Sequence, residues 1–332
     1  MLRGMVIRKK WRLTKRLGKG GYGEVYLGLD FDTNEQVAVK LEKIGVRERQ
    51  ALKMEVEILG KIQESPYSTK LIDYGHTQEY NYLVMELLGA NLSALKKRSR
   101  YDKFSLSTTL KLGILMIEAI QAIHEAGYVH RDIKPANFLL RTPEKRTSGK
   151  AMLTIIDFGL AKELLNSDGS LKLKREKVGF RGTARYSSYH AHFKRDLGRR
   201  DDMWSLLYIL IEFYTGTLPW SGIKEKEKIA DSKKELDSLQ LVRGLPPQFA
   251  DFLKHIQKLG FYDAPDYDYL KTLLADCYKE NGYDDTTKFD WELGGNNGFN
   301  SDLPSSESRN YSNVPGVHVS SKEEKCCKCE MF

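Results

Sequence analysis

The sequence contains little cysteine. Only four of its 332 residues are cysteine, namely Cys277 and a cluster close to the end formed by Cys326, Cys327 and Cys329. The body of the chain therefore has no pair of cysteines that a disulfide bond can join, which points to a reducing compartment. We expect a cytoplasmic protein and leave the nucleus open as a second location.

Long apolar runs are also missing. The first residues, MLRGMVIRKKWRL, contain no apolar core of signal-peptide length. The most apolar run, residues 203–214, contains Glu212 and is too short to cross a bilayer, which takes about 20 residues. We therefore expect no segment that crosses a membrane.

Acidic residues are outnumbered by basic ones. The net charge is +8, while the hydrophobic content of 41% and the charged content of 30% are ordinary for a soluble protein. From Gly294 onward there are five acidic residues and four basic ones, so the positive excess belongs to the preceding part. Such a surface can attract nucleic acid, an anionic membrane or acidic proteins, or it can simply be well solvated.

Two short motifs in the middle of the chain carry most of the chemical information. The first is VHRDIKPAN at residues 129–137, and the second is IIDFG at residues 155–159. An isolated HRD triplet is a common accident. The pattern H-R-D-x-x-x-x-N followed by D-F-G after an apolar run is instead a signature of protein kinases, and a chance match on a polar loop is the weaker alternative.

The residue types in these motifs suit phosphoryl transfer, which depends on placed charges more than on covalent help from the protein. Asp132 is placed to accept the proton of an attacking hydroxyl group, and Lys134 can stabilise the charge on the moving phosphoryl group. Asn137 and Asp157 offer oxygen ligands to Mg²⁺, which prefers few protein oxygens together with phosphate oxygens. We predict two catalytic residues and two metal ligands from these positions.

A glycine-rich stretch near the start predicts a phosphate-binding loop in a hairpin over residues 13–29. Gly18, Gly20 and Gly23 form G-x-G-x-x-G, and Val25 follows two residues later. Glycine lets the backbone approach phosphates closely because no Cβ intrudes. The same spacing marks dinucleotide sites, but there it lies between a strand and a helix, whereas strand-type sequence follows here. The context therefore favours a kinase loop.

The stretch VAVK places a lysine in the same cleft. Because side chains alternate along a strand, Ala38 and Lys40 share one face, which we assign to the cleft. A lysine at this position can meet the α- and β-phosphates of ATP. Residues 47–63 read as a helix in which Glu55 is the acid among inward apolar positions, so we predict an ion pair between Lys40 and Glu55.

Other segments complete the cleft and its surroundings. Residues 82–88 read as a strand that leads into a linker, whose backbone groups can bind adenine while Met85 guards the pocket behind. Asp202, at the start of an apolar helix, can hold the backbone of the loop that carries Asp132.

We also expect a long helix over residues 107–126, a polar hairpin tip at the surface over residues 141–150, and a buried helix that opens at residues 202–205.

Taken together, the motifs resemble those of the casein kinase 1 group of eukaryotic protein kinases. The resemblance rests on MELLG at residues 85–89, HRDIKPANFL, GTARYSS at residues 182–188, RRDDMWSL, and LPW at residues 218–220. The group lacks the usual A-P-E motif, and SSYHAH stands in its place here. LKMEV, KVGFRGTARY, AHFKRDLGRRDDMWSL and KFDWE are most similar to the tau-tubulin kinase branch, and the similarity covers residues 11–292.

The resemblance implies an α+β, bilobal protein-kinase fold. A small lobe with an antiparallel sheet and one main helix (the N-lobe, residues 11–86) would precede a larger, mainly helical lobe (the C-lobe, residues 87–292). Residues 1–10 would form an N-terminal extension, and residues 293–332, rich in Gly, Asn, Ser and acidic residues, are expected to be a disordered tail.

The resemblance also implies an activity and its cofactors, namely transfer of the γ-phosphoryl group of Mg²⁺-ATP to serine or threonine hydroxyl groups of protein substrates. The tau-tubulin branch suggests cytoskeletal substrates, and nucleic acid is not expected as a partner. Carried over to matching positions, Lys40, Glu55, Asp132 and Lys134 are catalytic, and the ATP-binding residues are Leu17, Gly18, Lys19, Gly20, Gly21, Gly23, Val25, Ala38, Lys40, Met85, Glu86 and Leu88.

A preference for acidic or already phosphorylated substrates is a further implication. In casein kinase 1 relatives a basic pocket reads an acidic or phosphorylated residue upstream of the target. Arg185 matches one arginine of that pocket, and Lys224 and Lys228 roughly match its lysines. The loop between Asp157 and Tyr186 is itself basic, with seven basic residues against four acidic ones.

The chain ends KCCKCEMF, which raises the question of a lipid anchor. Cys329 begins a loose C-a-a-X box whose last residue, Phe332, favours geranylgeranyl, and palmitoylation of Cys326 and Cys327 would supply a second chain for stable anchoring. Glu330 stands where an aliphatic residue is usual. We therefore hold peripheral membrane attachment and an unmodified tail as equal expectations.

Two rival functions remain to be weighed. A pseudokinase would have the fold without catalysis, but such proteins usually lack residues of the Lys40, Asp132 or Asp157 type, and all three are present. A dinucleotide-binding oxidoreductase would explain the glycine loop alone. It leaves the HRD and DFG segments without a role.

Overall fold

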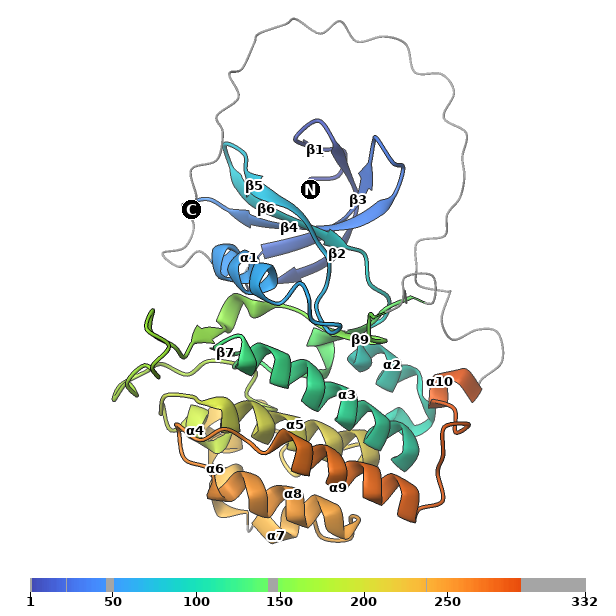
Figure 1. The fold of residues 1–332 in the computed structure, drawn as a ribbon, viewed down its shortest axis with the longest axis vertical. Coiled ribbons are helices and arrows are strands. Elements are labelled where there is room, and N and C mark those ends of the chain that lie inside the picture. Colours follow the sequence, from blue (N-terminus) through green and yellow to red (C-terminus); the bar gives the residue numbers. More distant parts are fainter. Residues whose placement is uncertain (1, 22, 46–50, 143–148, 237, 294–332) are drawn as a thin grey trace, which may run out of the picture.

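The chain folds into two lobes, as the bilobal expectation requires (Figure 1). The computed structural model describes residues 2–21, 23–45, 51–142, 149–236 and 238–293. Two predicted features lie outside these residues: the tail from residue 294 onward, with the lipidation candidates Cys326, Cys327 and Cys329, and residues 143–148 of the expected hairpin tip.

The N-lobe is built on one antiparallel sheet with the strand order β1-β2-β3-β4-β6-β5. Val25 lies opposite Lys40, and Ala38 lies opposite Met85. Since residues opposite each other on neighbouring strands share a face, these four side chains lie on the same side of the sheet. The strands are β1 (Val6–Ile7), β2 (Trp11–Gly20), β3 (Gly23–Asp30), β4 (Gln36–Lys43), β5 (Leu71–His76) and β6 (Tyr80–Glu86).

The opposite face of the sheet has its own apolar core, which includes Trp11, Tyr26 and Val39. The first residues of the chain contribute to it, because β1 pairs with β2 and Ile7 is completely buried. The sheet therefore begins at Val6, ahead of the lobe boundary that the sequence suggested at residue 11.

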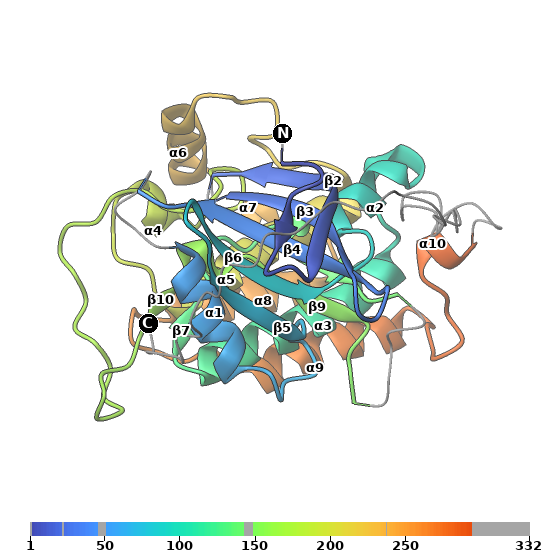
Figure 2. The same ribbon diagram turned by 90° about the horizontal axis from the view of Figure 1, so that it is seen from above.

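One helix, α1 (Ala51–Lys61), packs against the N-lobe sheet and falls inside the range predicted for it (Figures 1 and 2). Its apolar positions recur at helical spacing, so Ile58 and Leu59 are buried on the same side as Glu55. Glu57 lies on the outer side, where its carboxylate is 3.4 Å from the ammonium group of Lys61. Burial of one glutamate and exposure of the other follow from this periodicity.

The C-lobe is mainly helical and lies below the sheet (Figure 1). Its long helix α3 packs against α5 and α9. The helices are α2 (Leu92–Arg98), α3 (Leu106–Glu125), α4 (Tyr189–His192), α5 (Arg199–Thr215), α6 (Lys226–Glu235), α7 (Ser238–Leu241), α8 (Pro247–Lys258), α9 (Tyr267–Glu280) and α10 (Asp290–Leu293). Two short antiparallel pairs join β7 (Tyr128–Val129) to β10 (Lys162–Glu163) and β8 (Phe138–Leu140) to β9 (Leu153–Ile155).

Helix α3 is the one helix in the described residues that is long and apolar enough to cross a bilayer. Of its most apolar 18-residue window, 67% is buried inside the fold, and the helix packs against α5 and α9. Its apolar character is therefore explained by its place in the centre of the C-lobe.

The structure corrects two expectations about local segments. The apolar helix α5 begins at Arg199 rather than at Asp202, because the carboxylate of Asp201 caps it by accepting a hydrogen bond from the backbone N–H of Gly198 at 2.8 Å. The segment expected as a surface hairpin tip begins with a buried residue, since Arg141 is only 1% exposed. The β8–β9 pair thus carries a charged side chain into the protein.

Candidate active site

The loop after β7 is held from below by one buried carboxylate. Asp202 accepts hydrogen bonds from the backbone N–H groups of His130 and Arg131, at 2.8 and 2.9 Å, and contacts Nε2 of His124 at 2.9 Å. Arg131 adopts a left-handed backbone conformation, with φ of 65°. Such a conformation is unfavourable for a non-glycine residue, and the hydrogen bonds to Asp202 offset its energetic cost. The expected role of Asp202 in fixing this loop agrees with these contacts.

Asp132 follows directly and has both carboxylate oxygens engaged. Lys134 donates to one oxygen at 2.5 Å, and the hydroxyl group of Thr183 donates to the other at 2.7 Å. The side-chain amide of Asn137 donates to the backbone carbonyl of Asp132 at 2.9 Å. A carboxylate, an ammonium group and a threonine hydroxyl thus meet at one point, although Thr183 lies 51 residues along the chain.

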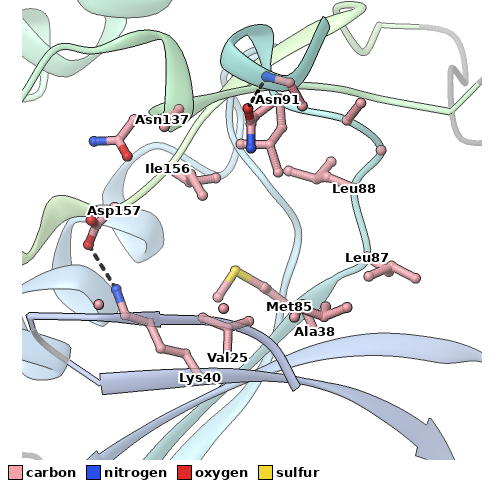
Figure 3. A pocket seen from close by; sticks show the side chains of 18 of the residues that line it. Val25, Ala38, Lys40, Met85, Leu87, Leu88, Asn91, Asn137, Ile156 and Asp157 are labelled. Atoms are coloured by element: carbon pink, nitrogen blue, oxygen red, sulfur yellow. Dashed lines mark hydrogen bonds and ion pairs between the residues drawn. The ribbon is translucent and has the colours of Figure 1, made fainter. Parts of the chain in front are cut away.

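Lys40 joins the two lobes through two carboxylates. Its ammonium group lies 2.5 Å from the carboxylate of Glu55 on α1. It also lies 2.9 Å from the carboxylate of Asp157, which follows β9 (Figure 3). Burial acts to lower the pKa of the Lys40 ammonium, but the two carboxylates outweigh burial and raise the pKa above its usual value. Likewise, burial acts to raise the pKa of Asp157, but the Lys40 ammonium outweighs it and keeps the pKa low. The side chains of Lys40, Glu55 and Asp157 therefore hold one another in place, and Lys40 and Asp157 are charged.

These residues line a cleft of about 650 Å³ between the lobes. Lys40 reaches from the sheet toward Asp157, with Val25, Ala38 and Met85 on the sheet side of the cleft and Leu88 and Ile156 on the other side (Figure 3). Glu55, Asn137 and Asp157 lie on its wall. Every residue predicted to bind ATP lies there too, namely Leu17, Gly18, Lys19, Gly20, Gly21, Gly23, Val25, Ala38, Lys40, Met85, Glu86 and Leu88.

Several wall residues were not predicted. Ile156 directly precedes Asp157, and Leu139 lies in β8 two residues after Asn137. Asn91, Ala94 and Arg98 recur at helical spacing on α2, but nothing in the sequence showed that this helix faces the cleft.

The predicted anion pocket is more nearly neutral than the sequence suggested. The guanidinium group of Arg185 lies 2.5 Å from the carboxylate of Glu212 and 2.7 Å from the hydroxyl oxygen of Ser221. Lys224 and Lys228 are exposed, and Lys228 has Glu225 within 3.8 Å. Because the charge of Arg185 is already compensated, the role of these three residues stays a prediction.

The basic loop is also partly neutralised by its surroundings. Lys162 and Arg175 both bind the buried carboxylate of Asp196, at 2.5 and 2.8 Å, and Lys172 binds Glu163. Burial acts to raise the pKa of Asp196, but Arg175 and Lys162 outweigh it and hold the pKa far below its usual range. The basic residues of the loop that form no ion pair within the described part of the chain are Lys174, Lys177 and Arg181.

Lys233 supports the same region and had not been singled out from the sequence. It projects from α6, is 8% exposed, and donates hydrogen bonds to the backbone carbonyls of Ala184, Arg185 and Ser187 at 2.9, 3.1 and 2.6 Å. Its ammonium group also lies 4.7 Å from the ring centre of Trp220. Lys233 thereby fixes the backbone that follows Thr183.

Comparison with known proteins places the chain in a family. Residues 11–284, most of its length, match the family model described as the protein kinase domain. The chain belongs to the protein kinase family. A curated relative of this kinase from Dictyostelium discoideum is named "Probable serine/threonine-protein kinase" and is 46% identical over 296 residues. The aligned region is 89% of this chain but only 59% of that relative, so this kinase spans less than two thirds of the relative's length.

Membership of the family decides between the interpretations of the glycine loop. The strand β3 that follows Gly23 returns to the sheet beside β2, as in a hairpin, and no helix begins there. A dinucleotide site needs that helix. The oxidoreductase alternative is therefore wrong for this kinase.

The clamp on the catalytic loop can be tested by removing Asp202. We expect Asp202→Ala to lower the free energy of unfolding by about 3–5 kcal/mol, because it leaves two buried backbone N–H groups and His124 without their acceptor. Chemical denaturation of the two proteins measures the difference. Asp290→Ala is the control, because the carboxylate of Asp290 accepts hydrogen bonds from the backbone N–H and the hydroxyl group of Ser105 at the surface. Its loss should lower the free energy of unfolding by about 1 kcal/mol. Similar losses for both variants would contradict the clamp.

Proposed function

We propose that this chain is a serine/threonine protein kinase of the casein kinase 1 group, most similar to the tau-tubulin kinase branch. The observation that carries the proposal is the meeting of Asp132, Lys134 and Thr183 beside Asn137, which lines the same cleft as Lys40 and Asp157. The relative's printed name and the motifs GTARYSS and LPW support the same assignment.

The geometry suits proton removal from a substrate hydroxyl group. Asp132 presents a carboxylate that already accepts a hydrogen bond from one hydroxyl group, that of Thr183. A serine or threonine of a substrate at the same place could transfer its proton to Asp132 as its oxygen bonds to the γ-phosphorus of ATP and the bond from that phosphorus to the bridging oxygen breaks, with ADP as the leaving group. Lys134 stands 2.5 Å from that carboxylate and can stabilise negative charge on the phosphoryl group in transit.

Nucleotide and metal would be held in the cleft that Lys40, the glycine loop, Asn137 and Asp157 line. Lys40 can contact the α- and β-phosphates, and the glycine loop can cover them with backbone N–H groups. Asn137 uses its amide nitrogen to bind Asp132, which leaves its amide oxygen as a ligand, and Asp157 supplies a carboxylate. One amide oxygen and one carboxylate suit Mg²⁺, which would neutralise negative charge on the phosphates if it were bound here.

Transfer of the γ-phosphoryl group from radiolabelled ATP to casein tests the activity. The proposal expects label on casein in the presence of Mg²⁺, and phosphoserine or phosphothreonine after acid hydrolysis. No transfer by a folded protein that binds Mg²⁺-ATP would support the pseudokinase alternative. Label on tyrosine would overturn the serine/threonine assignment.

We also propose a preference for acidic or phosphorylated substrates, with cytoskeletal proteins as the first natural candidates. Lys174, Lys177 and Arg181 are exposed and not neutralised by ion pairs within the described residues, so they rather than Arg185 supply the attraction. We expect a peptide with acidic or phosphorylated residues upstream of its serine to have a kcat/KM about five- to tenfold above that of a neutral peptide, the effect of one or two exposed ion pairs.

A charge-reversed variant makes the preference specific. Replacing Lys174, Lys177 and Arg181 together by glutamate should remove the advantage of the acidic peptide and leave kcat/KM for the neutral peptide unchanged. Lys254→Glu, on the exposed side of α8, is the matched control and should leave the preference intact. Equal turnover of both peptides by the unmodified protein would refute the preference.

A cytoplasmic location is a proposal that rests on the cysteine content. Cys277 is a buried free thiol, and burial raises its pKa to about 11, so it is protonated and unreactive at neutral pH. The other cysteines lie in the tail, outside the described residues, and their lipidation remains a prediction.

A further inference from the structure

Arg141 is a charged side chain that the function described so far leaves unused. It follows β8 and is one of the largest completely buried side chains in the described part of the chain. Burial of a guanidinium group is unfavourable unless its donors are paired. The question is therefore which groups it binds and why they need to be joined.

The guanidinium group of Arg141 joins three separate segments. It donates to the carboxylate of Glu86 from Nε at 3.2 Å and from Nη2 at 2.7 Å. It also donates to the backbone carbonyls of Pro66 and Ser68, at 3.2 and 2.7 Å, and to that of Ala151 at 2.6 Å. Arg141 thus connects the end of β6, the connection between α1 and β5, and the start of β9.

Glu86 is the group of interest among these partners, because it ends β6 and begins the linker to the C-lobe. The same carboxylate oxygen accepts a hydrogen bond from the backbone N–H of Lys70 at 3.3 Å, and the backbone N–H of Glu86 donates to the carbonyl of Lys70 at 3.0 Å. Its side chain is therefore directed away from solvent and into a network, not toward a nucleotide.

The strand β8, which directly precedes Arg141, also holds the far end of the linker. The backbone N–H of Gly89 donates to the carbonyl of Leu140 at 2.8 Å, and the N–H of Leu140 donates to the carbonyl of Ala90 at 3.0 Å. Residues 86–90 all line the cleft. The linker is consequently held at both ends by residues 140 and 141, and a small rotation of either contact would move its backbone groups.

We propose that Arg141 and Glu86 form a joint that positions linker residues 86–90 for nucleotide binding, with Arg141 as a positioning residue. The inference rests on the proposed function, in that the cleft is taken to bind ATP. Charged hydrogen bonds of a planar guanidinium group fix orientation as well as distance, which suits this task. A lysine at position 141 can fill only part of the network.

The first experiment measures the Kd of a non-hydrolysable ATP analogue with Mg²⁺ by calorimetry on the full chain. Glu86→Ala and Arg141→Lys should raise the Kd about tenfold, because binding must then also order the linker. Glu86→Gln keeps a hydrogen-bond acceptor, so its Kd for the analogue should lie between the Kd of these two variants and that of the unmodified protein. If phosphoryl transfer is detected, KM for ATP should rise while kcat and KM for the peptide stay within about twofold.

A matched control separates positioning from loss of stability. Tyr67 lies in the same α1–β5 connection, and its hydroxyl group donates to Glu118 on α3 without touching Glu86. Tyr67→Phe should lower the melting temperature but leave the Kd unchanged. An unchanged Kd in folded Glu86→Ala, or an equal rise of the Kd in Tyr67→Phe, would overturn the proposal.

A second readout does not depend on the proposed function. Amide hydrogen exchange of residues 85–91 in the nucleotide-free protein should be about tenfold faster in Glu86→Ala than in Tyr67→Phe, because the joint restrains the linker itself. Equal exchange would overturn the joint whether or not the protein binds ATP. If the unmodified protein binds no nucleotide but exchange is faster in Glu86→Ala, the proposed function fails while the joint stands.

Discussion

Replacing Asp132 by asparagine is expected to lower kcat by about 10²–10⁴-fold, the usual contribution of a general base, while the affinity for ATP changes little. Asparagine has nearly the same shape: its amide oxygen can still accept a hydrogen bond from Lys134, and its amide NH2 can donate to the hydroxyl oxygen of Thr183, the two groups that Asp132 binds. It cannot accept the proton of the attacking hydroxyl group. Steady-state kinetics with casein or a peptide measure kcat, and calorimetry measures nucleotide binding.

The control for Asp132→Asn is Asp168→Asn. Asp168 lies on the exposed loop after β10, where it binds only its neighbour Ser170 among the described residues. Its replacement should leave kcat within about twofold, as is usual for surface substitutions. A kcat for Asp132→Asn close to that of the unmodified protein would show that the proton is accepted elsewhere.

Replacing Lys40 by methionine should have the second-largest effect, a loss of about 10²–10³-fold in kcat/KM for ATP, the range found when one charged or hydrogen-bonding contact to the reacting groups is removed. Lys40 is the cation that connects Glu55 on α1 with Asp157 after β9. Its removal leaves Glu55, whose side chain is 3% exposed, without its partner. We therefore also expect a loss of about 3–5 kcal/mol in the free energy of unfolding.

Two further variants keep this prediction decisive if Lys40→Met is unstable. Lys40→Arg retains the charge but has a different shape and should recover most of the stability with little of the activity. Lys43→Met, at the exposed end of the same strand, should change neither the free energy of unfolding nor kcat/KM for ATP. Retention of kcat/KM in folded Lys40→Met would exclude a role of the Lys40 ammonium in nucleotide binding.

Local patterns were sufficient to predict the parts of the site whose residues lie close together in the chain. Alternation along VAVK placed Ala38 and Lys40 on one face, and both line the cleft. Helical spacing placed Glu55 among the inward apolar positions of its helix, and Glu55 is buried. These predictions succeed because strand and helix periodicity depend on backbone geometry, which is the same wherever the element is placed.

Contacts between distant segments could not be predicted in the same way. The sequence suggested an exposed Arg141 in a polar stretch, but the fold brings it against Glu86, 55 residues earlier, and against carbonyl groups that no sequence pattern marks. The loop between Asp157 and Tyr186 likewise looked basic, although Asp196 and Glu212 neutralise part of its positive charge.

The chain's residues alone thus predicted the candidate catalytic groups and much of the wall of the cleft, since these depend on spacing within one element or one motif, and the resemblance of the motifs implied the protein kinase fold class. Which charges remain available to a substrate, and which side chain holds the linker in place, was decided only when the chain folded. Pairing of a buried charge depends on what other segments bring to it, and burial makes that pairing obligatory.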